Sequence, residues 1–108
     1  MNGYDIFKKA LVRLGLESFE QKLAERAEEY LNEICADLNL QSIDSLSKEI
    51  NLSTEYIEAL TVGLSMMFSY SEGDTQKNKL FCDLYNAKRA RVLSKTEKIQ
   101  DTLPKGGV

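Results

Sequence analysis

Histidine is absent from this sequence of 108 residues, and cysteine is rare. Without histidine the chain has no imidazole to act as a general base, to activate a nucleophile or to bind a metal ion. The two cysteines, Cys35 and Cys82, lie far apart and outside any ligand-spacing motif, which argues against a zinc site and against a disulfide framework. We expect both thiols to be small buried groups in a reducing compartment.

Phosphate-binding loops are missing as well. The only adjacent glycines are Gly106 and Gly107, which lack the rest of a phosphate-loop motif. Carboxylates are plentiful in residues 17–37, but they fall on the outer face of a predicted helix. Catalytic carboxylate pairs need burial or a cleft to separate their pKa values. We therefore expect no enzymatic activity, no cofactor and no metal ion.

The sequence also has little that favours a sheet. It contains one proline, Pro104, and few valine or isoleucine residues. With 43% hydrophobic and 29% charged residues, its composition is typical of one soluble globular domain. Residues 1–5 show no basic segment leading into an apolar core, so we expect no secretory signal. These features predict an all-α protein.

The most informative stretch runs from Ser53 to Asp74. Ser53 or Thr54 can cap the start of a helix, and Gly73 predicts its end. No charged residue occurs in residues 59–71, and apolar side chains occupy most faces of the predicted helix. Such a helix is normally buried by several neighbours. It is too short for a membrane span, which needs about 20 apolar residues.

Three further helices are predicted around this one, over residues 4–14, 18–38 and about 74–94. Gly15 is expected to end the first helix in the left-handed conformation, and Ser18 with Gln21 fits a capping box for the second. Residues 39–52 are rich in turn formers, with one helical turn expected near residues 45–50. We predict a small bundle of about four helices around a central buried helix, with a C-terminal helical arm. Residues 1–95 would form a single domain and residues 96–108 a flexible, loose tail.

Charge is distributed unevenly along the chain. Residues 1–74 contain 6 Lys and Arg against 14 Asp and Glu, a net charge of −8, whereas residues 75–108 contain 8 against 3, a net charge of +5. Basic residues on a solvated helix end would also suit the negative end of the helix dipole. The alternative is a basic arm that docks on an acidic surface or on nucleic acid.

A DNA-binding alternative comes from residues 46–60, whose apolar spacing resembles a helix-turn-helix. The N-terminal residues of its second helix would lie in the major groove. There Glu55 and Glu58 would repel the phosphates, and Lys48 is the only basic residue between positions 27 and 76. A small DNA-binding regulator and a generic helical interaction module both remain as alternative functions.

Three segments resemble the head–tail connector, or adaptor, proteins of long-tailed bacteriophages. They are AERAEEYLNEICADL (Ala24–Leu38), EALTVGLSMMFSYSEGD (Glu58–Asp74) and NKLFCDLYNAKRARVLS (Asn78–Ser94), and the likeness extends over residues 4–95. This resemblance implies a structural subunit of a ring that docks on the portal protein and bridges it to tail-completion or stopper proteins. It also implies a virion component assembled in the host cytoplasm, with no membrane association.

In such connectors the C-terminal segment commonly docks on the portal. Carried over to this sequence, that implies the docking residues Lys88, Arg89, Arg91, Lys95, Lys98, Ile99 and Leu103. An acidic face either lines a DNA channel or faces solvent, and its candidate residues are Glu25, Glu28, Glu29, Glu33 and Asp37. The ring would contain about twelve copies joined head to tail. DNA would pass through it without sequence-specific binding, since a like-charged channel releases no counterions.

Overall fold

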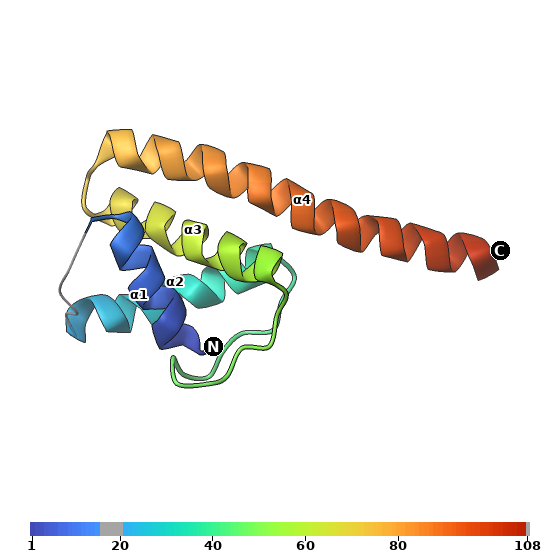
Figure 1. Cartoon of the computed structure of the whole chain (residues 1–108), viewed down its shortest axis with the longest axis horizontal. Coiled ribbons are helices and arrows are strands. Elements are labelled where there is room, and N and C mark those ends of the chain that lie inside the picture. The colour runs from blue at the N-terminus through green and yellow to red at the C-terminus, as the bar shows by residue number, and fades with distance from the viewer. Residues whose placement is uncertain (16–20, 108) are drawn as a thin grey trace.

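The computed structural model describes residues 1–15 and 21–107, including side chains up to residue 94 except those of residues 21 and 22. Within these ranges the chain forms four α-helices and no strand (Figure 1). They are α1 (Gly3–Arg13), α2 (Gln21–Asp37), α3 (Thr54–Ser71) and α4 (Thr75–Gly107). The predicted all-α bundle of about four helices is confirmed.

Helix α1 begins at a capping box that the sequence analysis missed. The side-chain oxygen of Asn2 accepts a hydrogen bond from the backbone N–H of Asp5 at 3.0 Å. The Asp5 carboxylate in turn accepts one from the backbone N–H of Asn2 at 2.9 Å. The helix ends at Arg13 with Leu14 as its C-cap, and Gly15 follows with a φ of +77°, which confirms the predicted left-handed residue. The predicted capping box of α2 involves Ser18 and lies outside the described residues.

Helix α3 is the centre of the bundle, because it packs against α1, α2 and α4. Its buried residues run without interruption from Ala59 to Ser65 and continue at Phe68 and Ser69. The hydroxyl of Ser65 donates a hydrogen bond to the carbonyl of Ala10 at 3.0 Å, which satisfies a buried polar group at the crossing with α1. The prediction of a central buried helix is therefore confirmed.

Residues 38–53 connect α2 to α3 without any helix. The helical turn expected near residues 45–50 is reduced to one hydrogen-bonded turn, in which the Lys48 amide donates to the Ser45 carbonyl at 3.1 Å. Other backbone groups of this connection bond to the start of the chain. The Ile50 amide donates to the Met1 carbonyl at 2.7 Å, and the Leu46 carbonyl accepts from the Tyr4 amide at 3.1 Å. The first helix of the proposed helix-turn-helix is consequently absent from residues 46–53.

Helix α4 returns antiparallel to α3 after Gly73, whose φ of +76° confirms the predicted helix stop (Figure 1). Its 33 residues make it about 50 Å long, against about 27 Å for α3 with 18 residues. The last buried side chain described in α4 is Val92, at 1% exposure. The rest of the helix projects from the bundle as a single rod (Figure 1), and we call residues 93–107 the arm.

The arm confirms the predicted C-terminal helical extension but corrects its length. Residues 96–107 are helical rather than a loose tail. Residues 95–103 are rich in good helix formers and contain no glycine or proline, so helix α4 can continue from the bundle through them. The chain is elongated as a result, with a radius of gyration of 14.9 Å against about 13 Å for a compact domain of this length. The assignment of residues 1–95 to a single domain stays a prediction.

Helix α4 buries a narrower face than its apolar residues suggest. Phe81 and Tyr85 are each 5% exposed and belong to the core. Leu80 and Leu84 are apolar as well, yet they are 55% and 38% exposed. Helix α3 is the element that covers α4, so residues outside the stripe facing α3 stay in solvent. In the described part of the chain, none of the helices has the length and apolarity needed to cross a bilayer.

Candidate interaction surfaces

Two ion pairs connect α4 to the beginning of α3. Lys88 Nζ lies 2.7 Å from a carboxylate oxygen of Glu58, and Arg91 Nε lies 3.3 Å from one of Glu55. Both acidic residues are in the first turns of α3, where the helix dipole also favours negative charge. Exposed ion pairs contribute at most about 1 kcal/mol each, so their main effect is to orient the two helices.

Further positive charge surrounds Glu58. Its hydrogen bond and ion pair with Lys88 hold the pKa of this carboxyl below its usual value, and the nearby charges of Arg13 and Lys9 act in the same direction. Arg13 and Lys9 belong to α1, which therefore presents cations on the same side of the bundle as this α3–α4 contact.

A third set of contacts joins α4 to the end of α2. One carboxylate oxygen of Asp37 accepts hydrogen bonds from the Tyr85 hydroxyl at 2.6 Å and from Arg89 Nε at 2.8 Å. The hydrogen bond from Tyr85 is the main cause of a lowered pKa of Asp37. Partial burial opposes this shift, and the hydrogen bond and charge of Arg89 add to it. Burial, together with the bond to Asp37, raises the pKa of Tyr85. The phenol therefore remains a proton donor at neutral pH.

These contacts change the interpretation of the predicted docking residues. Lys88, Arg89 and Arg91 all pair with carboxylates of the same chain. Arg91 is the most open of the three, with 70% of its side chain exposed. The remaining predicted residues Lys95, Lys98, Ile99 and Leu103 are in the helical arm, but their side chains lie outside the described part. Docking on a portal stays a prediction for all seven.

The acidic face predicted on α2 is largely formed. Glu25, Glu29 and Glu33 are exposed at successive turns of one face, and Glu28 is half-buried beside them. Asp37 is the exception, because it is turned towards α4 and paired there. Four of the five predicted residues thus form a continuous acidic surface, which we call the acidic face.

An apolar hollow of about 530 Å³ opens between α2, α3 and the start of α4. We call it the methionine hollow, and it is lined by Tyr30, Met66, Met67, Tyr70, Asn78 and Cys82. Tyr70 stands at its rim with 77% exposure. Cys82, which we expected to be buried, is only half-buried here, whereas Cys35 is buried as expected. The uncharged stretch of α3 was the only sequence signal for this hollow.

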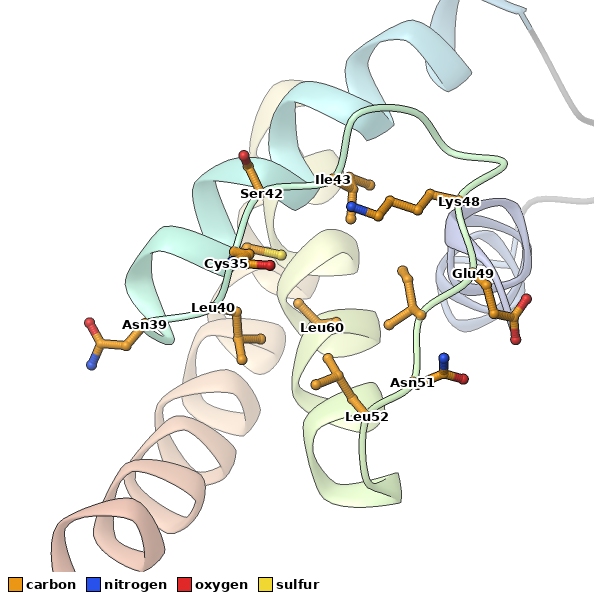
Figure 2. A pocket seen from close by; sticks show the side chains of 12 residues that line it. Cys35, Asn39, Leu40, Ser42, Ile43, Lys48, Glu49, Asn51, Leu52 and Leu60 are labelled. Carbon is orange, nitrogen blue, oxygen red and sulfur yellow. The ribbon is translucent and has the colours of Figure 1, made fainter. Parts of the chain in front are cut away.

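A second hollow, of about 340 Å³, lies under the connection between α2 and α3 (Figure 2). Leu40, Leu52 and Leu60 line its apolar side, and Figure 2 shows Lys48 extending towards Ile43. The Cys35 thiol also lines it, but burial raises the pKa of this thiol, which makes it a poor nucleophile at neutral pH. In the part of the chain that the structure describes, no group of three or more Cys, Asp or Glu residues could hold a metal ion.

The chain was compared with models of known protein families, with curated proteins and with solved structures, and none of the three comparisons found a match. Its function is therefore inferred from its own sequence and geometry.

Proposed function

We propose that this chain is a structural subunit of a head–tail connector ring of a tailed bacteriophage. In this role it docks on the portal protein and bridges it to tail-completion or stopper proteins around the DNA channel. The observation that carries the proposal is the arm, a helical extension of about 22 Å beyond Val92, which is the last buried side chain among the described residues of α4. A monomeric globular protein has little use for such a projection, whereas a ring subunit needs one to reach a neighbouring component.

The contacts at the base of the arm support this role. Lys88 and Arg91 pair with α3, and Arg89 pairs with α2, so the helix is held from two sides just before it leaves the bundle. These cations then orient the arm. The docking groups proper are the residues further along it, with Lys95 and Lys98 for an acidic portal surface and Ile99 and Leu103 as apolar anchors.

The acidic face suits the same assembly. Exposed carboxylates such as Glu25, Glu29 and Glu33 form no counterion-releasing contacts with DNA phosphates. If they line the channel, packaged DNA slides past them without binding. The DNA-binding regulator is less well supported, because residues 46–53 are not helical and Glu55 and Glu58 pair with α4.

The proposal can be tested by affinity capture of the tagged chain from its native lysate after nuclease treatment, with bound proteins identified by mass spectrometry. We expect portal and tail-completion proteins to be recovered. A chain ending at Ser94 keeps every contact of the bundle described above and lacks most of the arm. It should melt like the full chain but no longer recover the portal.

A truncation at Ala87 would be a poorer test of docking. It would also remove Lys88 and Arg89, whose ion pairs with Glu58 and Asp37 hold α4 to the bundle. The Ser94 truncation avoids this problem. Assembly of the truncated chain on portals would show that the arm does not dock. Recovery of a defined DNA fragment in place of portal proteins would favour the regulator.

A further inference from the structure

The connection between α2 and α3 lies like a strap along the bundle. We call residues 38–53 the strap, and they contain no helix. The ends of the strap continue into α2 and α3, and its middle approaches the first residues of the chain (Figure 1). Because the backbone groups of the strap are not paired within a helix, their partners in other elements decide where the strap lies.

The first of these partners is the start of the chain. Residues 1–4 pair with residues 46–50 through the two backbone hydrogen bonds described above and through one antiparallel bridge. Gly3 lies so close to the strap that a Cβ atom there would be 3.0 Å from the Leu46 Cα atom and 3.0 Å from the Leu46 carbonyl oxygen. We call this pairing of residues 1–4 with residues 46–50 the latch.

The second partner is a side chain of α2. The side-chain oxygen of Asn32 accepts a hydrogen bond from the Ile43 backbone N–H at 2.7 Å. Ile43 and Leu46 are 8% and 5% exposed and so attach the strap to the core. A small number of local contacts therefore holds the strap, and none of them is a hydrogen bond within a helix.

The underside of the strap is incompletely packed. The hollow of about 340 Å³ lies between the strap, with Leu40 and Leu52, and the body of the bundle, with Cys35 and Leu60 (Figure 2). Protein interiors rarely leave voids larger than a water molecule, and atoms that face a void lose dispersion contacts. Segments with few buried contacts open at a lower free energy than the core does.

We propose that the strap opens as a unit while the four helices stay folded, and that opening exposes the hollow and the Cys35 thiol. In the closed state Cys35 is 3% exposed. The latch and Asn32 set the population of the open state, because they supply the hydrogen bonds that opening breaks. The strap is thus a gate to an apolar hollow and a thiol. This inference does not depend on the connector function.

The experiment measures how fast Cys35 reacts with Ellman's reagent in the full chain at increasing urea concentrations. The chain carries Cys82→Ser, which removes the half-buried second thiol and keeps a hydroxyl in its place. Opening of the strap exposes less surface than unfolding of the whole chain. The rate of labelling should therefore rise less steeply with urea than global unfolding does in circular dichroism.

Two results of this experiment would overturn the proposal. Equal dependences on urea would show that only global unfolding exposes Cys35. Labelling in the native chain as fast as that of an exposed thiol would show that the strap does not act as a gate.

Two variants in the same background weaken the contacts of the strap. Asn32→Ala removes the acceptor of the Ile43 N–H and should speed labelling about two- to tenfold without changing the circular dichroism spectrum. Asn32→Asp keeps an acceptor oxygen and is the matched control, which should label like the parent chain. Gly3→Ala should also speed labelling, because its Cβ atom would press on Leu46 in the latch.

Gly73→Ala separates local opening from global stability. Gly73 lies at the turn between α3 and α4, far from the strap (Figure 1), and has a φ of +76° that disfavours a side chain. This variant should lower global stability and leave the labelling rate without urea unchanged. The proposal is wrong if Gly73→Ala speeds labelling as much as Asn32→Ala does, or if neither Asn32→Ala nor Gly3→Ala speeds it.

Discussion

Tyr85 donates a hydrogen bond of 2.6 Å to Asp37 and so connects the middle of α4 to the last residue of α2. The two residues are 48 positions apart in the sequence. The same carboxylate oxygen accepts a bond from Arg89, one turn later on α4. This shared acceptor holds α4 against the end of α2 just before the helix leaves the bundle.

Removing the phenol oxygen tests this connection. Tyr85→Phe should lower the free energy of unfolding by about 0.5–1.5 kcal/mol, because one hydrogen bond is lost while the ring stays packed. Urea unfolding monitored by circular dichroism measures the change. Tyr70→Phe removes an equivalent hydroxyl from a ring that is 77% exposed and should change stability little. Equal effects of the two substitutions would contradict the assigned role of Tyr85.

Acid should weaken the same connection. The pKa of Asp37 is lower in the folded chain than its ordinary value, so its ionised form stabilises the fold. This stabilisation is complete above the unfolded pKa of about 3.9 and is lost as pH falls through the folded value. Because Asp37 is partly exposed, the effect should not exceed about 1 kcal/mol. The difference in free energy of unfolding between wild type and Asp37→Asn should therefore narrow as the pH is lowered from about 7 to about 2.5. A constant difference would argue against a lowered pKa of Asp37.

Gly63 tests how closely the helices approach. A Cβ atom at this position would lie 2.9 Å from Ile34 Cδ1 and 2.9 Å from Tyr85 Cε1. Gly63→Ala should destabilise the fold by about 1–3 kcal/mol through overpacking, although alanine is the better helix former. Thermal melting measures the loss. An increase in melting temperature would show that α2 and α4 can move apart at no cost.

Gly73→Ala is the matched comparison for that substitution. No atom lies within 4 Å of a Cβ built at Gly73, but its φ of +76° disfavours a side chain. Its expected cost of about 1–2 kcal/mol therefore comes from the backbone alone. Adding Tyr85→Leu should relieve the defect of Gly63→Ala but leave that of Gly73→Ala unchanged.

Phe68 tests the centre of the core. Its ring contacts the ring of Phe7 with centroids 5.8 Å apart and the ring of Tyr30 at 5.3 Å. Phe68→Ala should cost about 3–5 kcal/mol, because it leaves a cavity at a fully buried site. Tyr70→Ala, two residues further along α3, removes an exposed ring and should cost less than about 0.5 kcal/mol. If urea unfolding shows that the two variants lose similar free energies of unfolding, the assigned orientation of α3 is contradicted.

Local features of the fold could be predicted from the sequence because they depend on neighbouring residues. Gly15 and Gly73 were predicted to end helices, and both have the positive φ that glycine adopts readily. The uncharged stretch of α3 was predicted to be central for a similar reason, since a helix that is apolar on most faces needs neighbours on most faces. The helical turn expected near residues 45–50 is limited to one hydrogen bond between Lys48 and Ser45, because other backbone groups of this segment bond to the distant N-terminal residues.

The candidate surfaces could not be predicted in full from the sequence, because they depend on contacts between segments that are far apart along the chain. The sequence identified Lys88, Arg89 and Arg91 as a basic cluster but not the carboxylates that pair with them, because helical periodicity says nothing about which helices meet. Leu80 has the same spacing as a core residue and is nevertheless exposed. The methionine hollow likewise combines residues of α2, α3 and α4 that are far apart in the sequence.

The helices, most of their ends and the identity of the central one follow from the order of amino acids, because periodicity, caps and glycine conformation act over a few residues. Which faces are covered, which charges are paired and how far the arm projects depend on how the helices pack. Burial and ion pairing depend on the separation of atoms in space. Each surface proposed to bind a partner is one that the packing of α1, α2 and α4 on α3 leaves uncovered.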